Sequence, residues 1–236
     1  MCAVGAVLTL ALSGCSGSTA DPIDPGAAGP PAPSTTTSPS TNLTDTTVAY
    51  LKAWAANDVA TMVRNSAPGS PARGYADYWG DVYAAGRLDS GAAQIRVRRE
   101  SATLTYSDGT TYRLSGFEAD TGGLVTWAAR PGGALAPRIV RGPPVSTRVA
   151  GLRITARIQY LNSESGLRIS LRVGNAGDAR RDFQTPVYTS PDGHRTTAAA
   201  GSGGRTGIVR VGPGSDLTAL VAAADAAPGG RLQIRV

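Results

Sequence analysis

Acidic residues that could act as a proton base gather in the middle of this 236-residue chain. Asp77 and Asp81 lie four positions apart, and Glu118 and Asp120 follow further on. Beside them are ring and hydroxyl side chains that can assist a carboxylate base in an apolar cavity, namely Tyr75, Tyr78, Trp79 and Tyr83. No histidine lies between residues 42 and 142, so the commonest proton shuttle is missing there. We expect Asp77 and Asp81 to be solvated helix residues, and a pocket enzyme remains the alternative.

Other catalytic chemistries have little support in the sequence. His194 is the only histidine, and Cys2 and Cys15 are the only cysteines, which excludes ordinary zinc sites and a Cys–His nucleophile. The only lysine, Lys52, has no serine near it, and the chain contains no G-x-S-x-G, P-loop or dinucleotide-binding motif. We therefore predict no catalytic residue, no metal site and no cofactor.

Cys15 follows an apolar run, Ala3–Leu12, which is shorter than the roughly 20 residues that cross a bilayer and fits the middle of an export signal. The residues Leu12-Ser13-Gly14-Cys15 resemble the bacterial lipobox. The resemblance implies cleavage before Cys15 and attachment of a diacylglycerol, with palmitate-type chains, to its sulfur. We expect residues 1–14 to be a signal peptide and the protein to be lipid-anchored on the extracytoplasmic face of the cell membrane. Because Met1–Val4 carries no positive charge, we also expect the natural start to lie upstream.

Residues 15–41 are dominated by Ser, Thr, Pro, Gly and Ala, with Ile23 as the only large apolar side chain. Such a segment cannot bury enough surface to offset the entropy of ordering it. We predict a lipidated, disordered linker that lifts the folded part of the chain away from the membrane.

Residues 42–142 begin with the apolar spacing of helices and end with the two-residue alternation of strands. The spacing predicts helices over 45–56 and 58–65, with Thr44 or Thr46 at the first start and Asp58 at the second. A third helix is expected over 75–85. Strands are expected from residue 95 onward, with a hairpin turn at Ser107-Asp108-Gly109. Helices followed by an antiparallel sheet predict an α+β fold.

The run Tyr50-Leu51-x-Ala53-Trp54-x-x-Asn57-Asp58-x-x-x-Met62 resembles the opening helices of the nuclear transport factor 2-like superfamily. The resemblance implies a curved antiparallel sheet wrapped around the helices, which leaves a cone-shaped pocket. The candidate pocket residues are aromatic and are Tyr50, Trp54, Tyr78, Trp79 and Trp127.

A second unit, residues 143–236, follows the linker signal Gly142-Pro143-Pro144. Leu152, Ile154, Ala156 and Ile158 alternate with polar residues, and Leu167 to Val173 repeat the pattern, which predicts an antiparallel β-sandwich. The segments Gly166–Ile169, Val173–Asp178 and Ala227–Leu232 resemble the immunoglobulin-like sandwiches of actinobacterial envelope proteins.

Net positive charge is concentrated in this second unit, which holds twelve of the 23 basic residues and only six of the 17 acidic ones. Nucleic acid is not an expected partner, because no more than two basic residues are adjacent. Acidic glycopolymers and anionic lipid headgroups fit the charge better. The side chains that would make an anionic-surface contact are Arg153, Arg157, Arg168 and Arg172. The alternative is that these arginines only keep a sheet soluble.

These features together predict a membrane-anchored envelope lipoprotein that acts as a non-catalytic binding or scaffolding module. Its expected partners are the membrane, through Cys15, and an envelope protein or acidic glycopolymer. The alternative is a small-molecule carrier or pocket enzyme that uses the cavity of residues 42–142.

Overall fold

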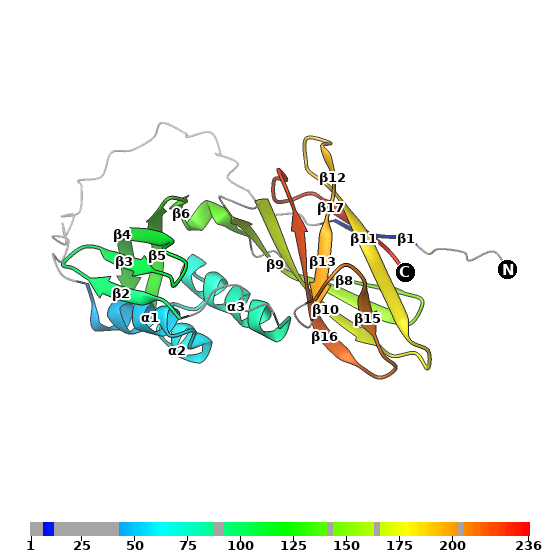
Figure 1. The fold of residues 1–236 in the computed structure, drawn as a ribbon, viewed down its shortest axis with the longest axis horizontal. Coiled ribbons are helices and arrows are strands. Elements are labelled where there is room, and N and C mark those ends of the chain that lie inside the picture. The colour runs from blue at the N-terminus through cyan, green and yellow to red at the C-terminus, as the bar shows by residue number, and fades with distance from the viewer. Residues whose placement is uncertain (1–6, 12–42, 87–91, 141–143, 163–165, 203–204) are drawn as a thin grey trace, which may run out of the picture.

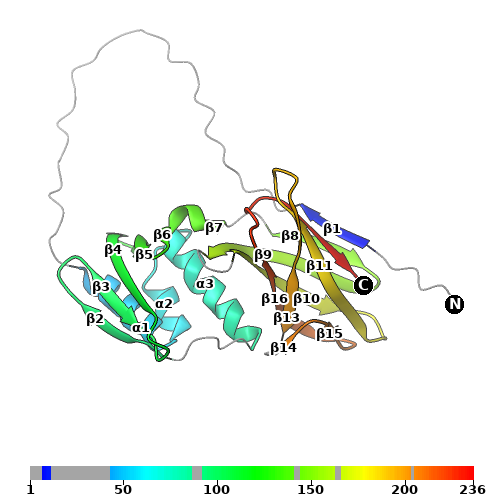
Figure 2. The ribbon, with the colours of Figure 1, turned by 45° about the horizontal axis from the view of Figure 1, so that its top comes forward.

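The computed structural model describes residues 7–11, 43–86, 92–140, 144–162, 166–202 and 205–236 (Figure 1). Cys15 and the expected linker lie outside these residues. The described chain has an α+β fold, as the order of patterns predicted. We call residues 43–138 the helical region, and residues 139–236 together with the strand Val7–Ala11 the β region. Figure 2 shows that the two regions lie side by side.

The helical region begins with three helices, each started by a side-chain cap. They are α1 (Asp45–Ala55), α2 (Val59–Arg64) and α3 (Pro71–Ala84). Thr44 and Asp58 accept hydrogen bonds from the backbone N–H groups three residues on, which confirms the expected starts of α1 and α2. The predicted start of the third helix was wrong. Ser70 caps it and Pro71 occupies its first turn, so α3 begins at Pro71 and not at the expected residue 75.

An antiparallel sheet packs against these helices in the strand order β2-β3-β4-β5-β6. Its strands are β2 (Gln94–Val97), β3 (Ala102–Thr105), β4 (Thr111–Asp120), β5 (Gly123–Arg130) and β6 (Gly133–Ala134). The predicted hairpin turn connects β3 to β4, with Gly109 at a φ of 84°. A short 3₁₀ helix, η1 (Ala136–Arg138), leads to the β region.

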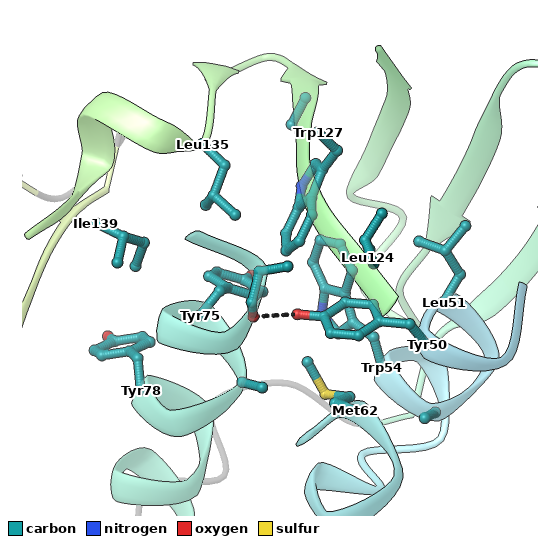
Figure 3. Packing of buried hydrophobic residues seen from close by; sticks show 14 of the residues in the cluster. Tyr50, Leu51, Trp54, Met62, Tyr75, Tyr78, Leu124, Trp127, Leu135 and Ile139 are labelled. Atoms are coloured by element: carbon teal, nitrogen blue, oxygen red, sulfur yellow. Dashed lines mark hydrogen bonds between the residues drawn. The ribbon is translucent and has the colours of Figure 1, made fainter. Parts of the chain in front are cut away.

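Tyr50 and its neighbours form a core between the helices and β5 (Figure 3). The Tyr50 hydroxyl donates a hydrogen bond to the backbone oxygen of Ala72, at 3.0 Å, which ties α1 to the first turn of α3. Gly123 opens β5 where the chain crosses Asn65. A Cβ there would lie 2.7 Å from the Asn65 backbone oxygen, so this crossing requires glycine.

The β region contains two sheets that share one core. The first runs β14-β13-β16-β10-β9-β7, with β8 also paired to β9, and the second runs β1-β17-β11-β12, with β15 paired to β11. The first sheet comprises β7 (Ile139–Val140), β8 (Val145–Val149), β9 (Leu152–Asn162), β10 (Gly166–Asn175), β13 (Ala199–Ser202), β14 (Arg205–Thr206) and β16 (Asp216–Ala223). The second comprises β1 (Val7–Ala11), β11 (Arg181–Thr189), β12 (Arg195–Thr197), β15 (Val209–Val211) and β17 (Arg231–Arg235).

The predicted alternation holds along β10 but changes partway along β9. Leu152, Ile154 and Ala156 point into the core shared by the two sheets, as expected, whereas Ile158 and Tyr160 belong to the core of the helical region. The cause is a register shift, because Ser170 pairs with Ile158 while Leu171 pairs with Ala156, which leaves Arg157 as an extra residue. One extra residue turns every following side chain to the opposite face. The prediction that Ile158 faces the same way as Ile154 was therefore wrong.

Val7–Ala11, in the apolar run expected to be an export signal, forms β1 and pairs antiparallel with β17 from Val7–Arg235 to Ala11–Arg231. These residues are therefore an edge strand of the second sheet. Cleavage before Cys15 would remove β1 and leave that edge of β17 without this partner.

Candidate functional site

Helix α3 lies between the sheet of the helical region and the first sheet of the β region (Figures 1 and 2). A surface helix usually buries one stripe, but α3 buries residues on two sides. Tyr75 contacts Trp127 of β5, and Tyr78 contacts Tyr160 of β9, with ring centroids 5.2 and 4.9 Å apart. The Arg157 bulge makes this packing possible, because it turns Tyr160 toward α3.

Asp81, near the C-terminal end of α3, stabilises the same junction. The residue is 4% exposed, and its two carboxylate oxygens accept hydrogen bonds from Arg157 and from the Ser170 hydroxyl, the latter at 2.7 Å. Burial raises the pKa of the Asp81 carboxyl above its ordinary value, while the Ser170 hydrogen bond and the Arg157 charge oppose that shift. The expectation that Asp81 is a solvated helix residue was wrong.

A cavity of about 290 Å³ lies beside this junction and is walled mainly by aromatic rings. The helices and β5 contribute Trp54, Tyr75, Tyr78, Trp79 and Trp127. Tyr75 is central among them, with edge contacts to Trp54, Trp79 and Trp127 at centroid distances of 5.1 to 6.1 Å. Rings in this arrangement hold one another in place and present flat apolar surface to the cavity.

The remaining walls come from two distant parts of the chain. Tyr106 and Tyr112 flank the β3–β4 turn, and Leu220 and Tyr160 come from the β region. Arg138 donates hydrogen bonds to the Leu161 backbone oxygen at 2.7 Å and to the Tyr160 hydroxyl at 2.9 Å. Its guanidinium also stacks over the Tyr160 ring, 5.0 Å from the centroid. The cavity is complete only when both regions are in place.

Two indole donors are buried in the cavity wall. The N–H groups of Trp54 and Trp79 lie beside the hydroxyls of Tyr106 and Tyr75 and oppose the rise in the pKa of those hydroxyls, although neither contact reaches full hydrogen-bond geometry. Because neither indole nitrogen is accessible, these donors belong to the packing of the wall and do not face a ligand.

The cavity holds no described group suited to take a proton at neutral pH. Burial raises the pKa of Tyr106 to about 12 and that of Tyr75 well above its usual range, so both hydroxyls stay neutral. Asp108 is the only acidic residue in the described lining and is exposed. The backbone N–H of Thr110, bonded to Asp108 at 2.8 Å, lowers the pKa of this carboxyl, which makes it a weaker base.

No family model matches the chain, and no curated protein or solved structure matches it either. None of the helices in the described part of the chain has the length and hydropathy that a membrane crossing needs. Within the same residues, no three His, Cys, Asp or Glu side chains come close enough to hold a metal ion.

Four of the five predicted pocket residues line the cavity, and the fifth does not. Tyr50 is fully buried beneath it, in the core of the helical region. The acidic candidates are dispersed, because Asp77 pairs with Arg73 on its own helix while Glu118 and Asp120 are exposed on β4.

The four arginines expected on one surface come from the neighbouring strands β9 and β10 and lie on the face of the first sheet opposite the β-region core, but they differ in what they contact. Arg153 and Arg172 are exposed, Arg157 contacts Asp81, and Arg168 lines the cavity. Sequence reasoning missed Tyr106, Tyr112, Arg138 and Tyr160. Only the first two had a local signal, since they flank the recognisable hairpin turn.

We predict that Asp81 and Ser170 are energetically coupled although 89 positions separate them. Asp81→Ala and Ser170→Ala should each reduce the free energy of unfolding, and the double variant should lose less than their sum by about 1 kcal/mol. Urea unfolding of the four proteins measures this coupling. Asp58→Ala, which removes the cap of α2, is the control and should show no coupling to Ser170→Ala. Additive losses for Asp81 and Ser170 would contradict the contact.

We also predict an unusual pH dependence for Asp81. Because burial raises its folded-state pKa above 3.8, the folded chain binds this proton more readily than the unfolded chain. The stabilisation is complete below the ordinary pKa and is lost as the pH rises through the folded value. The free energy of unfolding of the wild type, relative to Asp81→Asn, should therefore increase as the pH falls from neutral toward 3.8. A relative stability that decreases over this range would show that the carboxylate, not the acid, is preferred.

Proposed function

We propose that this protein is a lipid-anchored, non-catalytic binding protein of the cell envelope. The anchor is the diacylglycerol expected on Cys15, and residues 15–41 form the tether to the extracytoplasmic face of the membrane. Two acyl chains support this proposal physically, because one chain binds a membrane only marginally while two hold it stably.

The aromatic cavity at the junction is the observation that carries the binding role. Its size is near the lower end of ligand pockets, which span roughly 300–1,000 Å³. Its described lining offers ring surfaces and hydrogen-bond donors but no buried acid or activated nucleophile. Between a small-molecule carrier and a pocket enzyme, these features favour the carrier, in which the cavity holds a small molecule without transforming it.

We interpret the helical region as a cone-like domain of the nuclear transport factor 2-like kind and the β region as an immunoglobulin-like sandwich. The antiparallel sheet β2 to β6 packed against α1 and α3, and the core shared by the two sheets of the β region, support this reading. In this interpretation the second domain covers the mouth of the cone. The exposed Arg153 and Arg172 remain available to an acidic glycopolymer or an envelope protein.

The pairing of β1 with β17 offers a rival account of the N-terminal residues. A chain that kept Val7–Ala11 as a structural strand would not be cut before Cys15 and would carry no lipid. The two accounts predict different masses for the mature protein, so a direct experiment separates them.

We expect the protein produced in Gram-positive cells to begin at a diacylglycerol-modified Cys15 and to enter the detergent phase on Triton X-114 partitioning. Cys15→Ala should keep the leader and enter the aqueous phase, because no acyl chain is attached. Cys2→Ala is the matched control and should behave as the wild type, since Cys2 leaves with the leader. An intact mass for the wild type that includes residues 1–14, together with aqueous partitioning, would overturn the anchor.

A further inference from the structure

We propose that the junction cavity binds a compact, flat-ringed carboxylate. The inference rests on the binding role proposed above and specifies the chemical class of the ligand. Three properties of the cavity lead to it, namely the shape of its walls, the hydrogen-bond donors of Arg138 and the sign of its charge.

The walls require a flat and largely apolar body. The 290 Å³ cavity has room for about ten waters at roughly 30 Å³ each, which corresponds to a single substituted ring. Tyr75, Trp54 and Trp127 meet at centroid distances of 5.1 to 5.5 Å and leave ring faces and edges toward the space. A ring inserted among them gains the stacking and edge contacts that aromatic groups favour.

Arg138 supplies donors for an acceptor on that ring. A guanidinium has five N–H donors, and Arg138 uses its Nε for the Leu161 backbone oxygen and its Nη2 for the Tyr160 hydroxyl. The matching ligand atom is therefore an oxygen or nitrogen acceptor. An ionised oxygen makes the stronger bond, because charge-assisted hydrogen bonds are about twice as strong as neutral ones.

The charge of the lining selects an anion. Aromatic boxes often bind cations through their ring faces. Here, however, Arg138 and Arg168 line the cavity, and the only acid in the described lining, Asp108, is exposed at its edge. Two guanidinium groups repel a cationic ligand and attract a carboxylate. Arg138 is fixed by its bonds to the Leu161 oxygen and the Tyr160 hydroxyl, so its charge is held in place before any ligand arrives.

The chain offers a direct readout, because it has three tryptophans and all three line the cavity. Protein labelled with ¹⁵N at tryptophan should give three indole N–H signals, which Trp54→Phe and Trp79→Phe assign. Three probes share one ring and differ in charge: benzoate, benzyl alcohol and benzylamine. Titration with benzoate should shift the indole signals and saturate, because a ring seated among the tryptophans changes the ring-current shifts of their N–H groups. Benzylamine should leave the signals in place. Sharp, dispersed signals of the other two tryptophans in each variant show that it folds.

The arginine contribution has its own matched pair of variants. Arg168→Gln should weaken benzoate binding about fivefold and leave benzyl alcohol unaffected, since one charge near a bound anion contributes on the order of 1 kcal/mol. Arg153→Gln removes an exposed arginine of the same sheet and should leave both affinities unchanged.

The outcomes separate this inference from the proposed function. Binding of benzylamine at least as tight as that of benzoate would overturn the carboxylate class while still showing a working cavity. If none of the three probes binds at millimolar concentration, the carboxylate inference is overturned too. Detergent partitioning of the native protein would still test the lipid anchor on Cys15 independently.

Discussion

The single extra residue in β9 determines how the two regions of this protein meet. Without the bulge at Arg157, the alternation that buries Leu152, Ile154 and Ala156 would continue, and Tyr160 would face the core of the β region. With it, Ile158 and Tyr160 turn outward and meet α3. The same arginine contacts Asp81, so the residue that breaks the register also holds the helix against the sheet. Asp81 is buried and hydrogen-bonded to both Arg157 and Ser170. Other packing positions of α3 are disfavoured, because each would leave a charge or a hydroxyl buried without a partner.

The cavity is a consequence of this junction. Helix α3 contributes rings on one side, β5 and the β3–β4 hairpin contribute rings on another, and Tyr160 closes the space from the β region. Its walls are mainly neutral tyrosine and tryptophan rings, which suit the binding of a ligand. The same composition explains why we propose binding and not catalysis: among the described lining residues, the sole carboxyl has a lowered pKa and an exposed position.

Local signals in the sequence were sufficient for most individual elements. Caps at Thr44 and Asp58, the Ser107-Asp108-Gly109 turn and the alternation of Leu167 to Val173 each specify structure within a few residues, and each was predicted. The start of α3 was missed because a proline followed by glycine in a short stretch is typical of a loop, whereas Ser70 and Pro71 here open a helix. The α+β class followed from the order of the elements alone.

The site could be predicted only in part, because its geometry depends on contacts between distant segments. Trp54, Tyr78, Trp79 and Trp127 were recognisable as large rings in an α+β unit. Tyr160 and Arg138 gave no such signal, since their position depends on the β9 bulge and on η1. Asp81 has the sequence appearance of an exposed helix residue and is buried only because a sheet some 80 positions later covers it. No pattern of nearby residues records that contact.

The central claim is that the helical and β regions are docked through α3 and Tyr160. The most direct test is a nuclear Overhauser experiment on protein with labelled tyrosine rings. The 4.9 Å separation of the Tyr78 and Tyr160 ring centroids predicts strong cross-peaks between the two rings. Their absence, in a protein whose cross-peaks within each region are intact, would mean that the regions do not pack together, and the cavity described here would not exist.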